Sequence, residues 1–91
     1  MSVRESLIAA RALIDTPEKW IKGSSRNGQG GYCALGAMDK IGPESGCYLA
    51  LRSALPSEEP GFVAAYNDLP TTTHADILAL FDRAIAACEA P

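Results

Sequence analysis

Apolar residues recur every three or four positions over the first fifteen residues, which is the spacing of one buried face of an α-helix. Ser2 and Glu5 stand in the spacing of a capping box, in which each side chain bonds the backbone amide of the other residue. We therefore predict a helix over about residues 3–15. Its apolar stripe comprises Val3, Leu7, Ala10 and Ile14.

The end of the chain repeats this pattern. Thr73 and Asp76 have the spacing of a second capping box, and they open a predicted helix over about residues 74–89. Because the first and last helices have the strongest stripes, we expect them to pack together. The stripe of the last helix comprises Ile77, Phe81, Ala84, Ile85 and Cys88.

Shorter apolar segments lie between these two helices. Thr16 and Pro17 suit the N-cap and first position of a helix over about 17–22, which carries Trp20 inward and ends at Gly23. The remaining predicted segments are a buried helix over 33–41, a helix over about 43–55 with Cys47, Leu51 and Leu55 on one face, and a segment over 62–66 that suits either helix or strand.

The glycine-rich stretch is the candidate for a β-hairpin. Asn27 and Gly28 are typical of a type I′ turn, which predicts a small hairpin over about residues 22–33. The flanks lack β-branched residues, so a mobile loop is the alternative. The expected fold is mainly α, a bundle of four or five short helices with at most this one hairpin, in a single domain over residues 1–91.

Composition narrows the class of protein. The 91 residues carry a net charge of −3 and are 47% hydrophobic, as in an ordinary globular domain. No concentrated basic surface for nucleic acid and no apolar run of transmembrane length is evident. The odd cysteine count and the lack of a secretory pattern favour a cytoplasmic location with reduced thiols. We expect no cofactor.

Charge is divided unevenly along the chain. Residues 1–26 hold five basic and three acidic side chains, whereas residues 27–91 hold three basic and eight acidic ones. A basic contact surface near the glycine-rich stretch would suit a protein partner, and a homodimer is left open. Aromatic side chains beside loops are typical of such contact surfaces. The candidate partner-binding residues are Lys19, Lys22, Arg26, Tyr32 and Tyr48.

Cys33 and His74 suggest an alternative, a thiol hydrolase or transferase. A cysteine at a helix N-terminus is activated by the helix dipole, and a histidine further along the chain could serve as its base. Asn67 or Asp68 could orient that histidine, although both residues also suit a structural turn before Pro70. The cysteines and the histidine are too scattered for the paired ligands of a zinc site, so we expect no metal.

The glycines over 28–31 suggest a third reading, a small-anion or nucleotide sensor. Free amides at the start of the helix near Cys33 could hold an anion. However, Ala37 and Met38 stand where a phosphate-binding loop needs lysine and serine or threonine.

Several fragments, taken in order, resemble a family of small bacterial and phage proteins to which no activity is assigned. The resemblance implies a phage or mobile-element origin, and with it a non-enzymatic interaction module that inhibits or adapts a host defence complex. The matching residues are Trp20, Gly23, Cys33-Ala34-Leu35-Gly36-Ala37, Tyr66-Asn67-Asp68, Pro70 and Thr73-His74-Ala75-Asp76.

Overall fold

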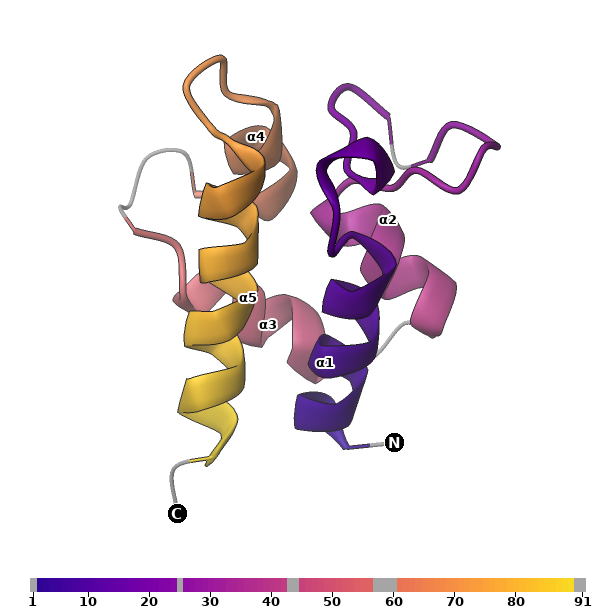
Figure 1. The fold of residues 1–91 in the computed structure, drawn as a ribbon. Coiled ribbons are helices and arrows are strands. Elements are labelled where there is room, and N and C mark those ends of the chain that lie inside the picture. Colours follow the sequence, from indigo (N-terminus) through magenta and orange to yellow (C-terminus); the bar gives the residue numbers. More distant parts are fainter. Residues whose placement is uncertain (1, 25, 43–44, 57–60, 90–91) are drawn as a thin grey trace.

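The computed structural model describes residues 2–24, 26–42, 45–56 and 61–89, which form short helices around one core (Figure 1). The two longest helices, α1 and α5, lie side by side and run in opposite directions. The elements in chain order are α1 (Val3–Leu13), the 3₁₀ turn η1 (Pro17–Lys19), α2 (Ala34–Ile41), α3 (Ser45–Ser53), α4 (Val63–Asp68) and α5 (His74–Glu89).

Both predicted capping boxes are present. The Glu5 amide donates to the Ser2 hydroxyl and the Ser2 amide donates to the Glu5 carboxylate, each over 3.1 Å. The Thr73 and Asp76 pair repeats this exchange at the start of α5. These local signals confirm where α1 and α5 begin.

The expected packing of α1 against α5 is also confirmed. Arg11 of α1 forms an ion pair with Asp82 of α5 across 2.8 Å. At the start of α5, a ring nitrogen of His74 lies 2.6 Å from the Ile14 carbonyl oxygen. Two cross-links therefore join the C-terminal end of α1 to the start and the middle of α5.

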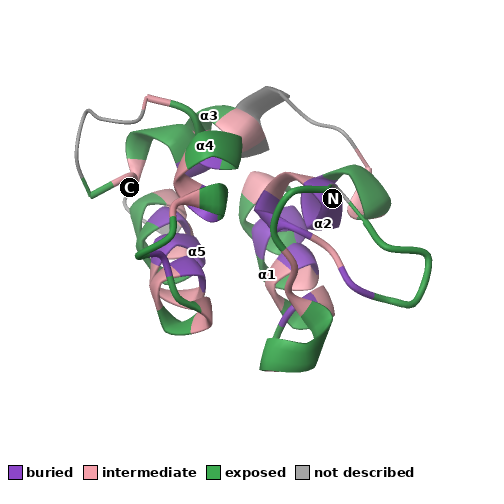
Figure 2. Cartoon of the chain, turned by 90° about the horizontal axis from the view of Figure 1, so that it is seen from above, coloured by how far each residue is buried: buried purple, intermediate pink, exposed green. Residues whose placement is uncertain are grey.

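The core lies around the buried face of α1, which packs against both α2 and α5, and Figure 2 shows the buried residues of these helices. The predicted stripes supply most of it, although Val3, Ile85 and Cys88 are only partly buried. Side chains that are fully or nearly fully buried include Leu7, Ala10, Ile14, Ala37, Met38, Leu51, Ile77, Leu80, Phe81 and Ala84.

The predicted helix over 17–22 is reduced to the single turn η1, and α1 stops at Leu13 rather than near residue 15. Thr16 has the extended backbone that a following proline favours, which ends the first helical run. Its side chain makes no capping bond with η1. The backbone of Trp20 is also extended, because it forms a parallel bridge with Tyr32 rather than continuing the helix.

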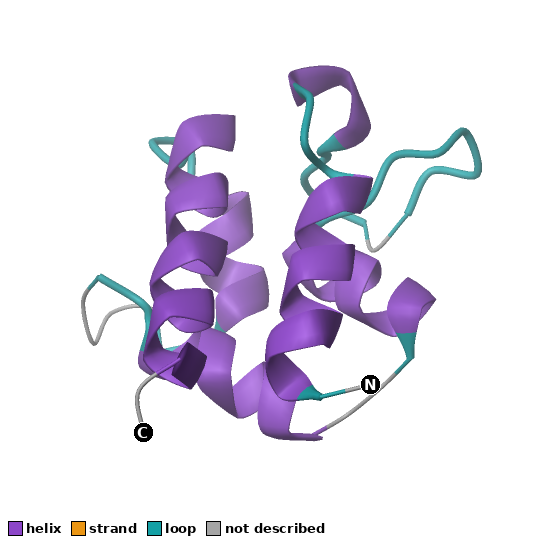
Figure 3. Cartoon of the chain, turned by 60° about the horizontal axis from the view of Figure 1, so that its bottom comes forward, coloured by secondary structure: helices purple, strands orange, loops and turns teal. Residues whose placement is uncertain are grey.

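The predicted hairpin over 22–33 is wrong. Among the described residues this stretch contains only isolated bridges, from Tyr32 to Trp20 and to Arg26, and Figure 3 draws it as loop. A type I′ turn needs positive φ at both central residues. Gly28 has a φ of +74°, but no described residue other than glycine has a positive φ, so Asn27 does not complete the turn.

The two remaining segments are helical. The segment over 62–66, which suited helix or strand, forms α4. The helix predicted over about 43–55 is described as Ser45–Ser53; residues 43–44 and the Cys47 side chain lie outside what the structure describes. Within the described ranges, every helix is too short or too polar to cross a bilayer.

Candidate functional site

A pocket of about 380 Å³ lies between the glycine-rich loop, residues 26–32, and the exposed face of α2. Figure 1 shows this loop projecting beside α2. The volume of the pocket falls within the range of small-ligand sites in proteins. We call it the cationic pocket, and its lining residues are Arg26, Tyr32, Gly36, Asp39 and Lys40.

Asn27 closes the loop that follows Arg26. Its side-chain oxygen accepts hydrogen bonds from the amides of Gln29, at 2.8 Å, and Gly31, at 3.0 Å. The Asn27 amide in turn donates to the Gly31 carbonyl. A Cβ at Gly31 would lie 2.7 Å from the Asn27 side-chain nitrogen, so the loop closes this tightly because residue 31 is glycine.

Tyr32 is held on both sides by the backbone. Its amide donates to the Lys19 carbonyl over 2.8 Å, and its carbonyl accepts from the Ile21 amide over 3.1 Å. The antiparallel bridge to Arg26 adds a third connection. The aromatic wall of the cationic pocket is therefore fixed to the chain around η1.

The opposite wall is one face of α2. Gly36, Asp39 and Lys40 are spaced three and four residues apart, which places them together on the helix surface. Cys33 begins this helix, and its sulfur accepts a hydrogen bond from the Gly36 amide at 3.3 Å. Tyr48 of α3 donates its hydroxyl proton to Asp39. The acidic residue of the pocket is thereby held from a second helix.

The two cations of this pocket have no counter-ion in the described part of the chain. Every other lysine and arginine takes part in an ion pair, a hydrogen bond, a ring contact or another recorded interaction. The side chains of Arg26 and Lys40 are exposed and make no such contact with the described residues. With Asp39 counted, the pocket keeps one net positive charge.

The structure separates the sequence-predicted partner residues into two groups. Arg26 and Tyr32 line the cationic pocket, and Tyr48 reaches it through Asp39. Lys19 instead lies 3.7 Å from Asp15.

Lys22, the remaining predicted partner residue, makes contacts within the protein. Its amine donates to the Leu69 carbonyl over 2.6 Å and lies 5.5 Å from the centre of the Trp20 ring. Of the predicted basic partner residues, Arg26 therefore lines the cationic pocket, whereas Lys22 does not.

Asn67 joins three segments of the chain from a fully buried position. Its oxygen accepts from the Trp20 indole at 2.6 Å and from the Ala34 amide at 3.1 Å. Its amide group donates to the Ile21 carbonyl and to Asp68. These contacts agree with the interpretation of Asn67 as a structural residue. One of them also holds the amide of Ala34, the residue after Cys33.

Asp68 completes this corner at the surface. Its carboxylate accepts from the Gly23 amide at 2.9 Å and from the side-chain amide of Asn67. These two donors, the Gly23 amide first, hold the pKa of Asp68 below its ordinary value, and the Lys22 charge adds to the effect. Burial opposes the shift, but by less than either hydrogen bond, because the side chain is exposed.

Cys33 and His74 make their recorded contacts with different partners. The Cys33 side chain, 6% exposed, lines a small hollow of about 180 Å³ together with Asp68. Its sulfur bonds the Gly36 amide, whereas the imidazole bonds the Ile14 carbonyl and lies 6.1 Å from the Trp20 ring. Asn67 is brought beside Cys33, but no recorded contact between described residues links the imidazole to the thiol.

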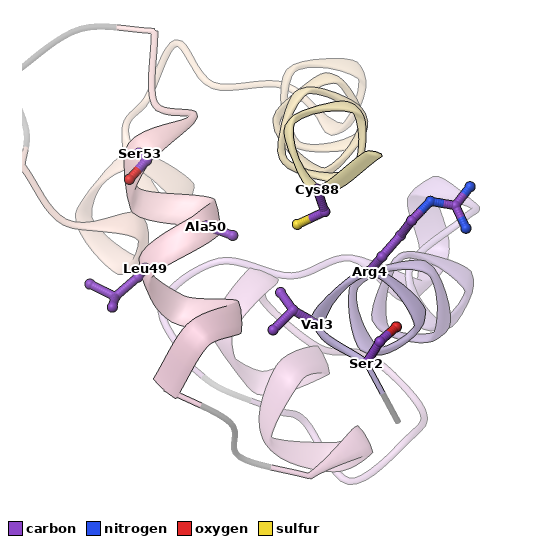
Figure 4. Close-up of a pocket in the computed structure, with 7 residues that line it drawn as sticks. All are labelled: Ser2, Val3, Arg4, Leu49, Ala50, Ser53 and Cys88. Carbon is purple, nitrogen blue, oxygen red and sulfur yellow. The ribbon is translucent and has the colours of Figure 1, made fainter. Parts of the chain in front are cut away.

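Another hollow, of about 550 Å³, lies between the ends of α1, α3 and α5 (Figure 4). Val3 and Cys88 point into the space between these helices, and the guanidinium of Arg4 points away from it. Its lining is mainly apolar, although Ser2, Arg4 and Ser53 also contribute to it. The described residues also contain no group of three metal-ligating side chains.

Gly36, Asp39 and Lys40 were not predicted from the sequence as residues of the site. Their helical spacing was available as a signal, because i, i+3 and i+4 positions share a face. What that face would meet depended on the path of the glycine-rich loop, which no local pattern predicted.

Fold and site together define a small all-helical domain with a cationic pocket beside a glycine-rich loop. The chain belongs to DUF6197, a family of unknown function, whose model matches residues 1–87. No curated protein and no solved structure matches the chain. The family match agrees with the resemblance to a family without an assigned activity, while an origin in bacteria or phages stays a prediction.

Proposed function

We propose that this protein is a non-enzymatic interaction module that binds another protein through the cationic pocket and its rim. The observation that carries the proposal is the convergence of Arg26, Tyr32 and Lys40 on one pocket, with both cations lacking a partner among the described residues. Arginine and tyrosine are enriched among the residues that dominate binding energy at protein interfaces.

The surface around the pocket supports this proposal. The Asn27 bonds and the Tyr32 backbone bonds fix the glycine-rich loop before a partner arrives. A pre-organised surface loses less conformational entropy on binding. The resemblance favours a host defence complex as the partner, with this protein as its inhibitor or adaptor.

The thiol-enzyme alternative keeps one supporting observation, the place of Cys33 at the start of α2 beside a small hollow. The interaction module is favoured over it because the recorded contacts of the imidazole and the thiol lead to different partners. The anion-sensor alternative concerns the same region as the cationic pocket.

The test is a comparison of baits in a pull-down from the native host. Wild-type protein is compared with the double variant Arg26→Glu/Lys40→Glu and with Arg52→Glu as a control for charge reversal away from the pocket. We expect one partner to be captured by the wild type and the control and lost by the double variant. Capture of the same proteins by all three, or of none by the wild type, would contradict the proposal.

A further inference from the structure

We infer that the cationic pocket receives a single carboxylate of the partner, an aspartate or glutamate side chain presented on a peptide segment. This inference rests on the proposed function and specifies its ligand. It follows from the charge, the geometry and the surroundings of the pocket.

The charge of the pocket matches one carboxylate. Arg26 and Lys40 supply two positive charges, and Asp39 offsets one of them. One net positive charge is neutralised by a singly charged carboxylate, whereas a phosphate group carries between one and two negative charges. A carboxylate therefore neutralises the pocket, whereas a phosphate would leave an excess of negative charge beside Asp39.

The geometry favours the same ligand. A guanidinium presents two parallel N–H groups that match the two oxygens of a carboxylate, and a lysine ammonium can add a third donor. Because neither cation has a partner among the described residues, no internal ion pair has to break when the ligand enters. A carboxylate alone would leave much of the 380 Å³ empty, which leaves room for the stem and neighbours of a peptide side chain.

The other walls suit that stem. Tyr32 offers a ring face with a polar tip, a combination that accepts both methylene groups and a hydrogen bond. Gly36 has no side chain to occupy the wall formed by α2. Asp39 is turned toward Tyr48 by a hydrogen bond, so its position relative to the ligand is fixed by α3.

The experiment is selection from a displayed library of random twelve-residue peptides, followed by affinity measurements with purified protein. We expect the selected peptides to share an aspartate or glutamate at one position. Changing that residue to asparagine or glutamine should weaken binding to the wild type about tenfold, the loss expected for one charge-assisted contact. The same change should have no effect on binding to Arg26→Gln/Lys40→Gln.

Further arms separate the alternatives. The control variant Arg52→Gln should bind the peptides as the wild type does, and urea unfolding should show that all variants are folded. Three results would each overturn the inference. The selected peptides share no acidic residue, or the asparagine or glutamine change still costs tenfold in the double variant. The third is tighter binding of a peptide in which phosphoserine replaces the shared acidic residue. If one of these peptide results is obtained while capture of the partner protein in the pull-down still depends on Arg26 and Lys40, the inference fails and the proposed function stands.

Discussion

The indole nitrogen of Trp20 donates a hydrogen bond of 2.6 Å to the side-chain oxygen of Asn67, forty-seven residues further along the chain. The same oxygen accepts the Ala34 amide at the start of α2. The segment after η1, the first turn of α2 and the end of α4 therefore meet on one buried side chain. Four hydrogen bonds saturate it, which makes this corner sensitive to substitution.

Asn67→Ala is expected to lower the free energy of unfolding by about 3 kcal/mol or more. The change leaves the Trp20 N–H, the Ala34 N–H and the Ile21 carbonyl without partners, and each unsatisfied buried group costs about 1–3 kcal/mol. Urea unfolding followed by circular dichroism measures the loss. The matched control is Asn27→Ala, whose side chain bonds two amides of an exposed loop and should cost under about 1 kcal/mol. Equal losses in the two variants would contradict the role given to Asn67.

Asp68 predicts a pH dependence of stability. Its pKa is lowered in the folded protein, chiefly by the Gly23 amide, so the carboxylate stabilises the fold above its unfolded pKa. That contribution is lost as the pH falls below about 4 and through the folded value. Asp68→Asn should therefore unfold at a lower urea concentration than the wild type at about pH 7, with the difference shrinking at about pH 3. If the difference in urea midpoint between the two proteins stayed constant from about pH 7 to about pH 3, the carboxylate of Asp68 would not be the source of the pH dependence.

Ser2→Ala should destabilise the protein by about 1 kcal/mol, because the variant loses the N-cap hydrogen bond to the Glu5 amide. Thermal unfolding followed by circular dichroism checks the value. Ser53→Ala, at the exposed C-terminal residue of α3, is a control that removes a hydroxyl without removing an N-cap and should change stability much less.

Cys88 should react with iodoacetamide before Cys33 in the native protein. Cys33 is 6% exposed and its sulfur bonds the Gly36 amide, whereas Cys88 is partly exposed at the large hollow near the end of α5. Mass spectrometry of peptides after short labelling at about pH 7 gives the order. Faster reaction at Cys33 would instead favour the thiol-enzyme alternative, since only an activated thiolate would overcome that burial.

Features encoded within a few residues were predictable from the sequence. The pairs Ser2–Glu5 and Thr73–Asp76 each lie three residues apart, and both form the capping boxes that their spacing predicts. The last helix has the predicted bounds for the same reason, because periodic apolar positions continue to its end.

Features that depend on distant partners were not predictable. The hairpin failed because the Asn27 side chain bonds the loop amides locally while Tyr32 pairs with the chain around η1. Lys40 joined the candidate site only because that loop passes the exposed face of α2. Contacts between segments that are distant in the chain leave no pattern in the local spacing of residues, so they cannot be predicted from a single sequence.

The beginning of α1 and the end of α5 lie close together, since Ser2 and Cys88 line the same hollow. None of the residues that form the cationic pocket belongs to either of these ends. A tether or a fluorescent label attached at one end is therefore next to the other end and away from Arg26. The molecule can be immobilised on a sensor chip through either end, with the cationic pocket still accessible from solution.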